Sequence, residues 1–215
     1  MSREVRVPAR VPRQARSHAT QARILDAAEA IVAGRGFEGA GVLLVVRRAG
    51  CSVGAFYSRF RDKQDLLVAL YDRFAAEAWA RIDASLDPRR WSNEPLPRCL
   101  NGLVRTLIEL HRQRRGLARA FVVEGQRDPV FQARRDRLFQ DAGGRLAGFV
   151  RGRPGAIGHH HPDRAVAFGL AVVWSTVESA VLFDRLRSGA LSPSDDDLAA
   201  ELVRLLVAYL GVAEV

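Results

Sequence analysis

The sequence has little of several things, and each shortage excludes a class of protein. Only two of its 215 residues are cysteine, Cys51 and Cys99, so no disulfide framework can hold the fold. No apolar run approaches the roughly 18 residues of a membrane span. No apolar segment of a secretory signal follows Met1. We therefore expect a cytoplasmic protein with no membrane partner.

The sequence also lacks the motifs of common enzymes and metal proteins. It contains no GxSxG, no phosphate-binding glycine loop, no HExxH and no pair of closely spaced cysteines. His111 could form an acid–base pair with Glu109 or Glu124, although such residues on helices are more often structural. Histidines 159–161 are adjacent in a stretch rich in glycine and proline, where no helix or strand aims them at one ion. We expect no catalysis, no cofactor and no metal.

Lysine is almost absent, because Lys63 is the only one and all other basic residues are arginine. Residues 1–63 contain 12 basic and 5 acidic residues, which gives +7 of the total net charge of +9. A basic end of this kind is the electrostatic footprint of a phosphate-binding surface. Charge that serves only solubility is the simpler interpretation, and it suits the rest of the chain better.

Residues 1–19 hold five arginines and are too polar to bury a core, so we expect them to be disordered. They could form an arm that follows DNA, as some DNA-binding proteins have. A solvated tail is an equally good interpretation.

The most informative stretch runs from Arg48 to Leu67. Gly50 accepts the positive φ of a tight turn, and Ser52 is placed to cap the helix that follows. Residues 53–59 then make about two helical turns, with Phe56 and Phe60 on one face that can pack on a core. A short helix that starts with small residues and is held from behind by aromatic residues is typical of an element that enters the major groove of DNA.

Around this stretch, residues 20–70 resemble the DNA-binding domain of the TetR family of bacterial transcriptional regulators. The matching residues keep the family's order and spacing: Arg23-Ile24-Leu25-Asp26-Ala27-Ala28, Gly36-Phe37, Arg48-Ala49-Gly50, Ser52, Gly54-Ala55-Phe56-Tyr57, Phe60, Lys63 and Leu66-Leu67. The resemblance implies a helix-turn-helix domain over residues 20–66. It also implies a helical domain over residues 67–215 that binds a small effector and forms a homodimer.

The resemblance also places the contacts to double-stranded DNA. The expected DNA-binding residues are Thr20, Ser52, Val53, Gly54, Ala55, Tyr57, Ser58, Arg59 and Lys63. Tyr57 and Lys63 match positions that hold phosphates. Arg59 is the best candidate for a bidentate contact to guanine, although a surface arginine near a phosphate is as good an interpretation. Thr20 is also expected to cap a first helix over residues 21–35.

The chain departs from the family's pattern on both helices of the motif. Ala40 and Gly41 stand where the family usually has threonine or serine, so the second helix, residues 42–49, starts without a hydroxyl. The run 42–46 is apolar all round, so at least one of its leucines is exposed or covered by another surface. Val53 cannot form a hydrogen bond with a base, but it can pack on a thymine methyl group.

Beyond Lys63 the pattern is helical throughout, with no strand alternation, and it predicts an all-α fold. The first of these helices runs to Ile82 and belongs to both domains. Several apolar and polar side chains between residues 70 and 187 are candidates for a ligand cavity, although such stripes more often form core. They are Trp79, Leu103, Leu107, His111, Phe121, Phe139, Trp174 and Glu178. Residues 165–186 are expected to form a helix with two faces, one broad and apolar and one of small residues, and the final helix, which Ser194 caps, has one strong apolar stripe. Two faces on one helix favour packing against a second copy in a two-fold dimer built as a four-helix bundle.

These features predict a ligand-responsive repressor that binds a palindromic operator as a dimer. Two other classes stay open. One is a helical interaction protein of the same fold that does not read DNA, which the apolar run 42–46 favours. The other is an enzyme that processes a small molecule in a helical pocket.

Overall fold

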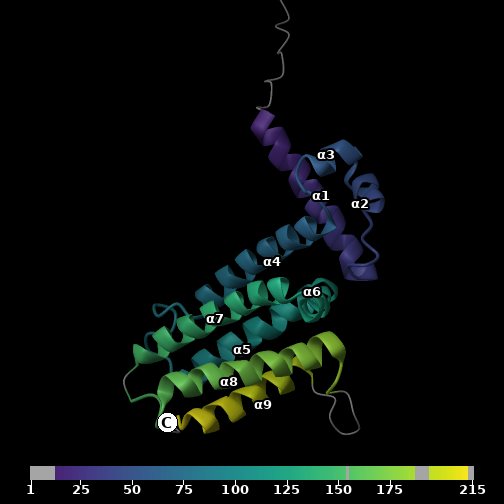
Figure 1. Cartoon of the computed structure of the whole chain (residues 1–215). Coiled ribbons are helices and arrows are strands. Elements are labelled where there is room, and N and C mark those ends of the chain that lie inside the picture. The colour runs from purple at the N-terminus through teal and green to yellow at the C-terminus, as the bar shows by residue number, and fades with distance from the viewer. Residues whose placement is uncertain (1–12, 154, 187–193, 213–215) are drawn as a thin grey trace, which may run out of the picture. The chain divides into compact units, whose positions relative to one another are not determined.

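The computed structural model of the chain describes residues 13–153, 155–186 and 194–212, and these residues form helices and connecting turns without a strand (Figure 1). The fold is therefore all-α. The chain divides into two compact units, residues 1–70 and residues 71–215. We call them the N-terminal unit and the C-terminal unit.

The N-terminal unit contains α1 (Arg13–Arg35), α2 (Val42–Ala49), α3 (Val53–Tyr57) and the start of α4 (Lys63–Ser85). α1 packs on α2, and α2 packs on α3. The buried side chains of Ile24, Val45, Phe56 and Leu66 come from all four helices and form the core. The turns follow from the sequence: Gly36 ends α1 with a φ of +69°, and Gly50 ends α2 with a φ of +60°.

The first helix starts earlier than the sequence pattern predicts. α1 begins at Arg13, so residues 13–19 are helical and Thr20 lies inside the helix instead of capping it. The physical reason is that no glycine or proline interrupts residues 13–33, and alanine, arginine and glutamine all favour a helix. The remainder of the predicted arm, residues 1–12, lies outside the described residues.

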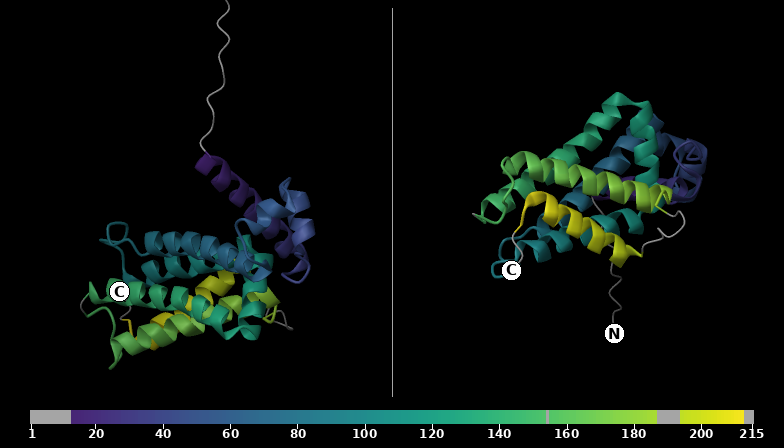
Figure 2. Two further views of the ribbon diagram at one scale, coloured as in Figure 1. Left: turned by 45° about the horizontal axis from the view of Figure 1, so that its top comes forward. Right: turned by 90° about the horizontal axis from the view of Figure 1, so that it is seen from below.

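The C-terminal unit contains the rest of α4, then α5 (Leu96–Gln113), α6 (Arg115–Arg127), α7 (Pro129–Arg151), α8 (Pro162–Val177) and α9 (Asp195–Leu210). α5 is central, because it packs against α6, α8 and α9. Figure 2 shows α8 and α9 side by side, in agreement with their contacts. Ser194 caps α9 as predicted, and its hydroxyl and backbone exchange hydrogen bonds with Asp197 in a capping box.

One predicted helix, residues 165–186, contains an irregular turn. α8 continues into a short π-helix, η1 (Glu178–Leu182), and the chain then turns at Asp184, which has a φ of +53°. Arg115 forms an ion pair with Asp184 there. Short π-helical segments within a helix often occur at functional sites, and Glu178 is the first residue of η1.

The expectation that no stretch is long enough to span a membrane needs correction. The stretch Pro162–Leu182 is long and apolar enough by length and composition. Ala165, Leu170 and Val177 in this stretch are buried in the C-terminal unit. A core helix of a soluble protein passes the same test, so the stretch is only weak evidence for a membrane.

Candidate functional site

The short helix α3 ends at Tyr57, with Ser58 as its C-cap, two residues earlier than predicted, but the cap at Ser52 and the aromatic anchor are as predicted. The hydroxyl of Ser52 accepts a hydrogen bond of 3.1 Å from the backbone N–H of Ala55, which caps the helix. Phe56 is fully buried and Phe60 almost so, and their ring centroids lie 5.3 Å apart. Because the back of α3 is fixed in the core, its opposite face is presented to solvent.

The exposed face of α3 is mostly apolar or small. Val53 is 39% exposed and Tyr57 is 55% exposed. Gly54 and Ser58 are also exposed, whereas Ala55 is half-buried. The structure therefore brings four of the predicted DNA-binding residues onto one accessible surface.

Arg59 is turned back onto the protein. Its Nη1 donates to the carbonyl of Ala55 at 2.7 Å and to the hydroxyl of Ser58 at 2.9 Å. Its Nε and Nη2 donate to the carbonyl and the hydroxyl of Ser17 in α1, at 3.3 Å and 3.2 Å. In this arrangement Arg59 ties α1 to the end of α3 and does not project a free guanidinium.

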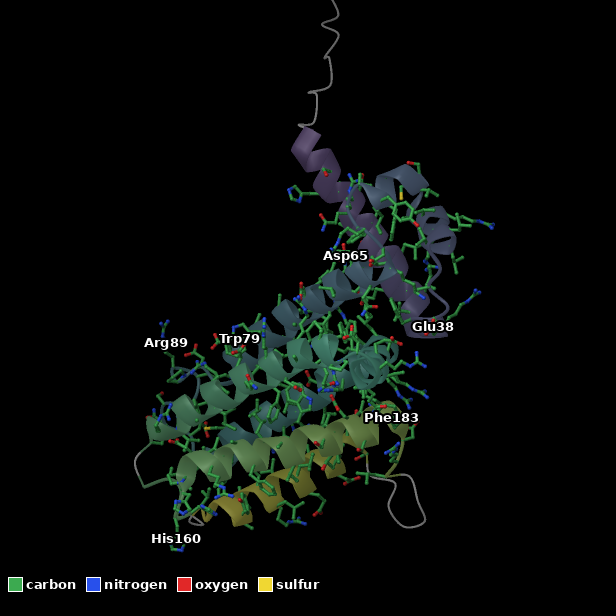
Figure 3. The ribbon with its side chains drawn as sticks, in the orientation of Figure 1. Glu38, Asp65, Trp79, Arg89, His160 and Phe183 are labelled. Atoms are coloured by element: carbon green, nitrogen blue, oxygen red, sulfur yellow. The ribbon has the colours of Figure 1, made fainter. Side chains whose placement is uncertain are left out.

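Lys63 also makes contacts within the N-terminal unit. Its Nζ donates to the carbonyl of Glu38 at 3.2 Å and lies 4.3 Å from the ring centroid of Phe37. Glu38 lies in the turn after α1 (Figure 3). Lys63 therefore joins this turn to the start of α4, while its side chain stays 27% exposed.

Two aspartates stabilise the start of α4. Asp62 accepts a hydrogen bond of 2.8 Å from the backbone N–H of Asp65. Asp65, labelled in Figure 3, accepts hydrogen bonds from the guanidinium and the backbone N–H of Arg61. These bonds lower the pKa of Asp65 to about 2, so this carboxylate is charged near the positive end of α4.

The apolar helix α2 leaves one large side chain in solvent. Leu43 is 73% exposed, whereas Val45 and Val46 are buried. Gly41 precedes the helix in an extended conformation and makes no side-chain cap. The sequence predicted an exposed leucine in this run and a start of α2 without a capping hydroxyl.

The C-terminal unit contains a cavity of about 260 Å³ between α4, α5, α6, α7 and α8. Aromatic side chains form much of its wall. Tyr71 and Phe74 of α4 meet Phe121 of α6, with ring centroids 5.2 Å and 5.5 Å from that of Phe121. Burial raises the pKa of Tyr71 to about 12, so its hydroxyl stays neutral.

A connected set of polar side chains forms another part of the cavity wall. Glu178 Oε1 accepts hydrogen bonds from Trp174 Nε1 at 3.0 Å and from Arg135 Nη2 at 2.8 Å. Arg135 Nη1 donates to Gln132 at 2.8 Å, and Gln132 donates to Asp136 at 2.7 Å. The Arg135 and Glu178 side chains are only 16% and 20% exposed, so their charges are partly desolvated and oriented toward each other. This wall can bind polar groups of a molecule whose remainder packs on the aromatic wall.

His111 is a second buried titratable group of this cavity, in addition to Tyr71. Its Nδ1 lies 2.7 Å from the carbonyl of Leu107, and a carbonyl can only accept, so Nδ1 carries the proton. Burial lowers the pKa of His111, which keeps the ring neutral. The ring meets that of Trp174 edge-on at a centroid distance of 5.6 Å.

The cavity collects some of the residues predicted to line it and leaves out others. His111, Phe121, Phe139, Trp174 and Glu178 line it. The other three predicted residues do not: Leu103 and Leu107 are buried core, and Trp79 of α4 is half-buried elsewhere (Figure 3).

Sequence reasoning missed Gln132, Arg135 and Asp136 of α7 as cavity residues. They lie three and four residues apart, so they share one helix face, and this spacing was a readable signal. That this face of α7 lines a cavity was not readable from the sequence, because it depends on how α7 packs against the other helices.

A second hollow lies on the surface of α8 and α9. It has a volume of about 190 Å³ and is lined almost entirely by apolar side chains. Phe168 and Val172 of α8 are 57% and 40% exposed, and Leu205 and Tyr209 of α9 are 61% and 40% exposed. We call these four residues the α8–α9 face. An exposed apolar surface of this kind is typical of a protein–protein interface.

Comparisons with known proteins cover both units. Residues 24–70 match the model described as bacterial regulatory proteins, tetR family, and residues 95–210 match that of the tetracyclin repressor-like C-terminal domain. A search of curated proteins found no significant match. Members of the tetR family are generally DNA-binding proteins without enzymatic activity.

Solved structures share the fold along most of the chain. A transcriptional regulator from Rhodococcus sp. RHA1 is 23% identical, with a TM-score of 0.71 over 91% of this chain and 98% of its own. A protein from Mesorhizobium loti that is assigned to the TetR family is 21% identical, with a TM-score of 0.73 over 91% of this chain and 97% of its own. A TetR-family regulatory protein from Rhodococcus RHA1 is 19% identical, with a TM-score of 0.69 over 91% and 98%.

The helix-turn-helix in the N-terminal unit, the helical C-terminal unit and the match of both to family models lead to one conclusion. This chain belongs to the TetR family of bacterial DNA-binding transcriptional regulators.

Proposed function

We propose that the protein is a repressor that binds a palindromic operator as a homodimer and releases it when a small molecule occupies the cavity of the C-terminal unit. The observation that carries the proposal is the accessible face of α3, which is capped at Ser52 and held from behind by Phe56 and Phe60. A helix fixed in this way suits insertion into the major groove. The excess positive charge of residues 1–63 supports binding to phosphates.

The proposed effector site is the cavity of about 260 Å³. Its aromatic wall and its polar wall suit a molecule that is largely apolar and has one polar end. Such an effector weakens DNA binding only by its preference for one of two conformations, typically by about 1–3 kcal/mol of coupling. α4 is the proposed connection, because this one helix starts in the N-terminal unit and lines the cavity with Tyr71 and Phe74.

The proposed dimer forms through the α8–α9 face. Two copies of this face would bury Phe168 and Leu205 in a four-helix bundle with two-fold symmetry. A two-fold dimer carries two copies of α3, so each operator should contain two inverted half-sites, one DNA turn or a multiple of a turn apart.

The test is a selection from randomised duplexes by the purified protein, followed by binding of the selected duplex over a range of salt concentrations. Enrichment of an inverted repeat with a steep salt dependence supports the proposal. A Tyr57→Phe or Lys63→Gln variant should weaken binding almost equally for all sequences, because phosphates carry no base identity. Weak binding without enrichment would contradict it and favour a helical interaction protein, with the exposed Leu43 as a candidate contact.

A further inference from the structure

Three polar side chains at the two ends of α3, those of Ser52, Ser58 and Arg59, already form hydrogen bonds within the N-terminal unit, and this restricts which bases the helix can read. We propose that α3 selects thymine through the methyl group of the base, with Val53 as the contact, and that Arg59 positions α3 and does not read guanine. The inference rests on the proposed function, because it concerns the operator that the protein binds.

The hydroxyl groups next to α3 serve the helix itself. Ser52 accepts the capping bond from Ala55 N at 3.1 Å. Ser58 donates to the Ala55 carbonyl at 3.0 Å and accepts from Arg59 Nη1 at 2.9 Å. Direct readout by either serine would compete with these bonds, which hold both ends of a helix of only five residues.

Arg59 is engaged still further. The three nitrogen atoms of its guanidinium donate four hydrogen bonds. Nε and Nη2 donate to Ser17 of α1, and Nη1 donates to the carbonyl of Ala55 and to the hydroxyl of Ser58. A bidentate contact to guanine uses two N–H groups in parallel. Arg59 could form this contact to guanine only by giving up the hydrogen bonds that join α3 to α1. These hydrogen bonds therefore indicate that Arg59 positions α3.

The surface that remains is apolar at its tip. Val53 is the first residue of α3 and is 39% exposed. Gly54 follows, and a Cβ placed there would meet only Ser52 Oγ at 3.9 Å, so the backbone of α3 is open to a close approach. Tyr57 is exposed but lies one helical turn further along. The thymine methyl is the apolar group that a base pair presents in the major groove, and it matches Val53.

The experiment uses the selected duplex and replaces thymine by uracil, one position at a time, which removes only the methyl group. The wild-type protein is expected to bind about fourfold more weakly when uracil replaces one contacted thymine of a half-site, the effect of losing one buried carbon. Substitution in both half-sites should weaken binding on the order of tenfold. In the Val53→Ala variant the difference between thymine and uracil at that position should disappear.

Leu43→Ala is the matched control, because Leu43 is also an exposed apolar residue of the N-terminal unit but lies on α2. This variant should keep the full sensitivity to uracil. An Arg59→Lys variant should select the same bases as the wild-type protein, because it changes the support of α3 and not its base contact.

Three outcomes would overturn the inference: no position is sensitive to uracil, the sensitivity persists in Val53→Ala, or Arg59→Lys loses a required guanine. In each of these the protein still selects an inverted repeat, so the proposed function stands. If the selection yields no preferred sequence, the proposed function fails and the inference fails with it.

Discussion

Gly102 lies inside α5 against the indole of Trp91, and we expect Gly102→Ala to destabilise the C-terminal unit. A Cβ at residue 102 would lie 2.7 Å from Cζ2 and 3.0 Å from Cη2 of Trp91. Carbon atoms pack at about 3.5–4.0 Å. The ring has little freedom to withdraw, because it is buried and its Nε1 donates to the carbonyl of Ser85 at 2.7 Å.

The expected cost follows from two opposing effects. Forcing an extra carbon into a packed core costs about 1–3 kcal/mol. Alanine recovers about 0.5–1 kcal/mol relative to glycine, because it favours the helical backbone. The net loss should be about 1–2 kcal/mol, and a unit of this size loses roughly 2–4 °C of Tm for each kcal/mol.

Gly144→Ala is the matched control, since Gly144 is inside α7 and no atom lies within 4 Å of the Cβ it would gain. This variant should be more stable than the wild-type protein by about 0.5–1 kcal/mol. Thermal and urea unfolding of the three proteins, at one protein concentration, measures both changes. A rise in stability for Gly102→Ala, equal to that of Gly144→Ala, would refute the argument from the Trp91 contact.

Three further predictions concern function and pH. Gly54→Ala should fold normally but bind the selected operator on the order of tenfold more weakly, because the added methyl group projects from the reading face; equal affinity in a titration would contradict this placement. Leu205→Glu should give a monomer in sedimentation, whereas Val130→Glu, an 80% exposed residue of α7, should not; a dimer in both variants would place the interface elsewhere. Burial lowers the pKa of His111 below its ordinary value of 6.5. Below pH 6.5 the unfolded chain therefore binds the proton more readily than the folded protein, so we expect the free energy of unfolding to fall as the pH drops from 6.5 toward the pKa of the folded protein. Between pH 7.5 and pH 5.5, the free energy of urea unfolding should fall less for His111→Gln than for the wild-type protein. The charge of Glu178 opposes the lowering of the His111 pKa, and that of Arg135 adds to it. The same pH dependence in both proteins would show that His111 is not the group responsible.

The local features of the N-terminal unit were predictable because they depend on neighbours in the chain. The cap at Ser52, the turn at Gly50 and the anchor formed by Phe56 and Phe60 follow from spacing and backbone chemistry. The start of α1 was not predictable in the same way. Residues 13–19 are basic but have good helix propensity, and in the structure Arg59 of a distant segment bonds to Ser17 in this part of α1.

Residues of the cavity were predictable only in part. Phe121, Phe139 and Trp174 are large side chains on helical stripes, but Leu103 and Leu107 fit the same pattern and are core. Periodicity identifies the inward face of a helix, and it does not distinguish a packed interior from a cavity wall. That distinction depends on which helices stand opposite, and so does the pair of Arg135 with Glu178.

By itself the sequence determined the all-α fold, the position of the helix-turn-helix and the turns and caps at Gly36, Gly50 and Ser52, because these depend on periodicity and on glycine and capping groups close in the chain. Only the tertiary structure decided that Arg59 bonds back to α1, that Gly102 lies against Trp91, and that a cavity opens among the helices of the C-terminal unit. The physical reason is that these features join side chains far apart in sequence, and their distances are set by how whole helices pack.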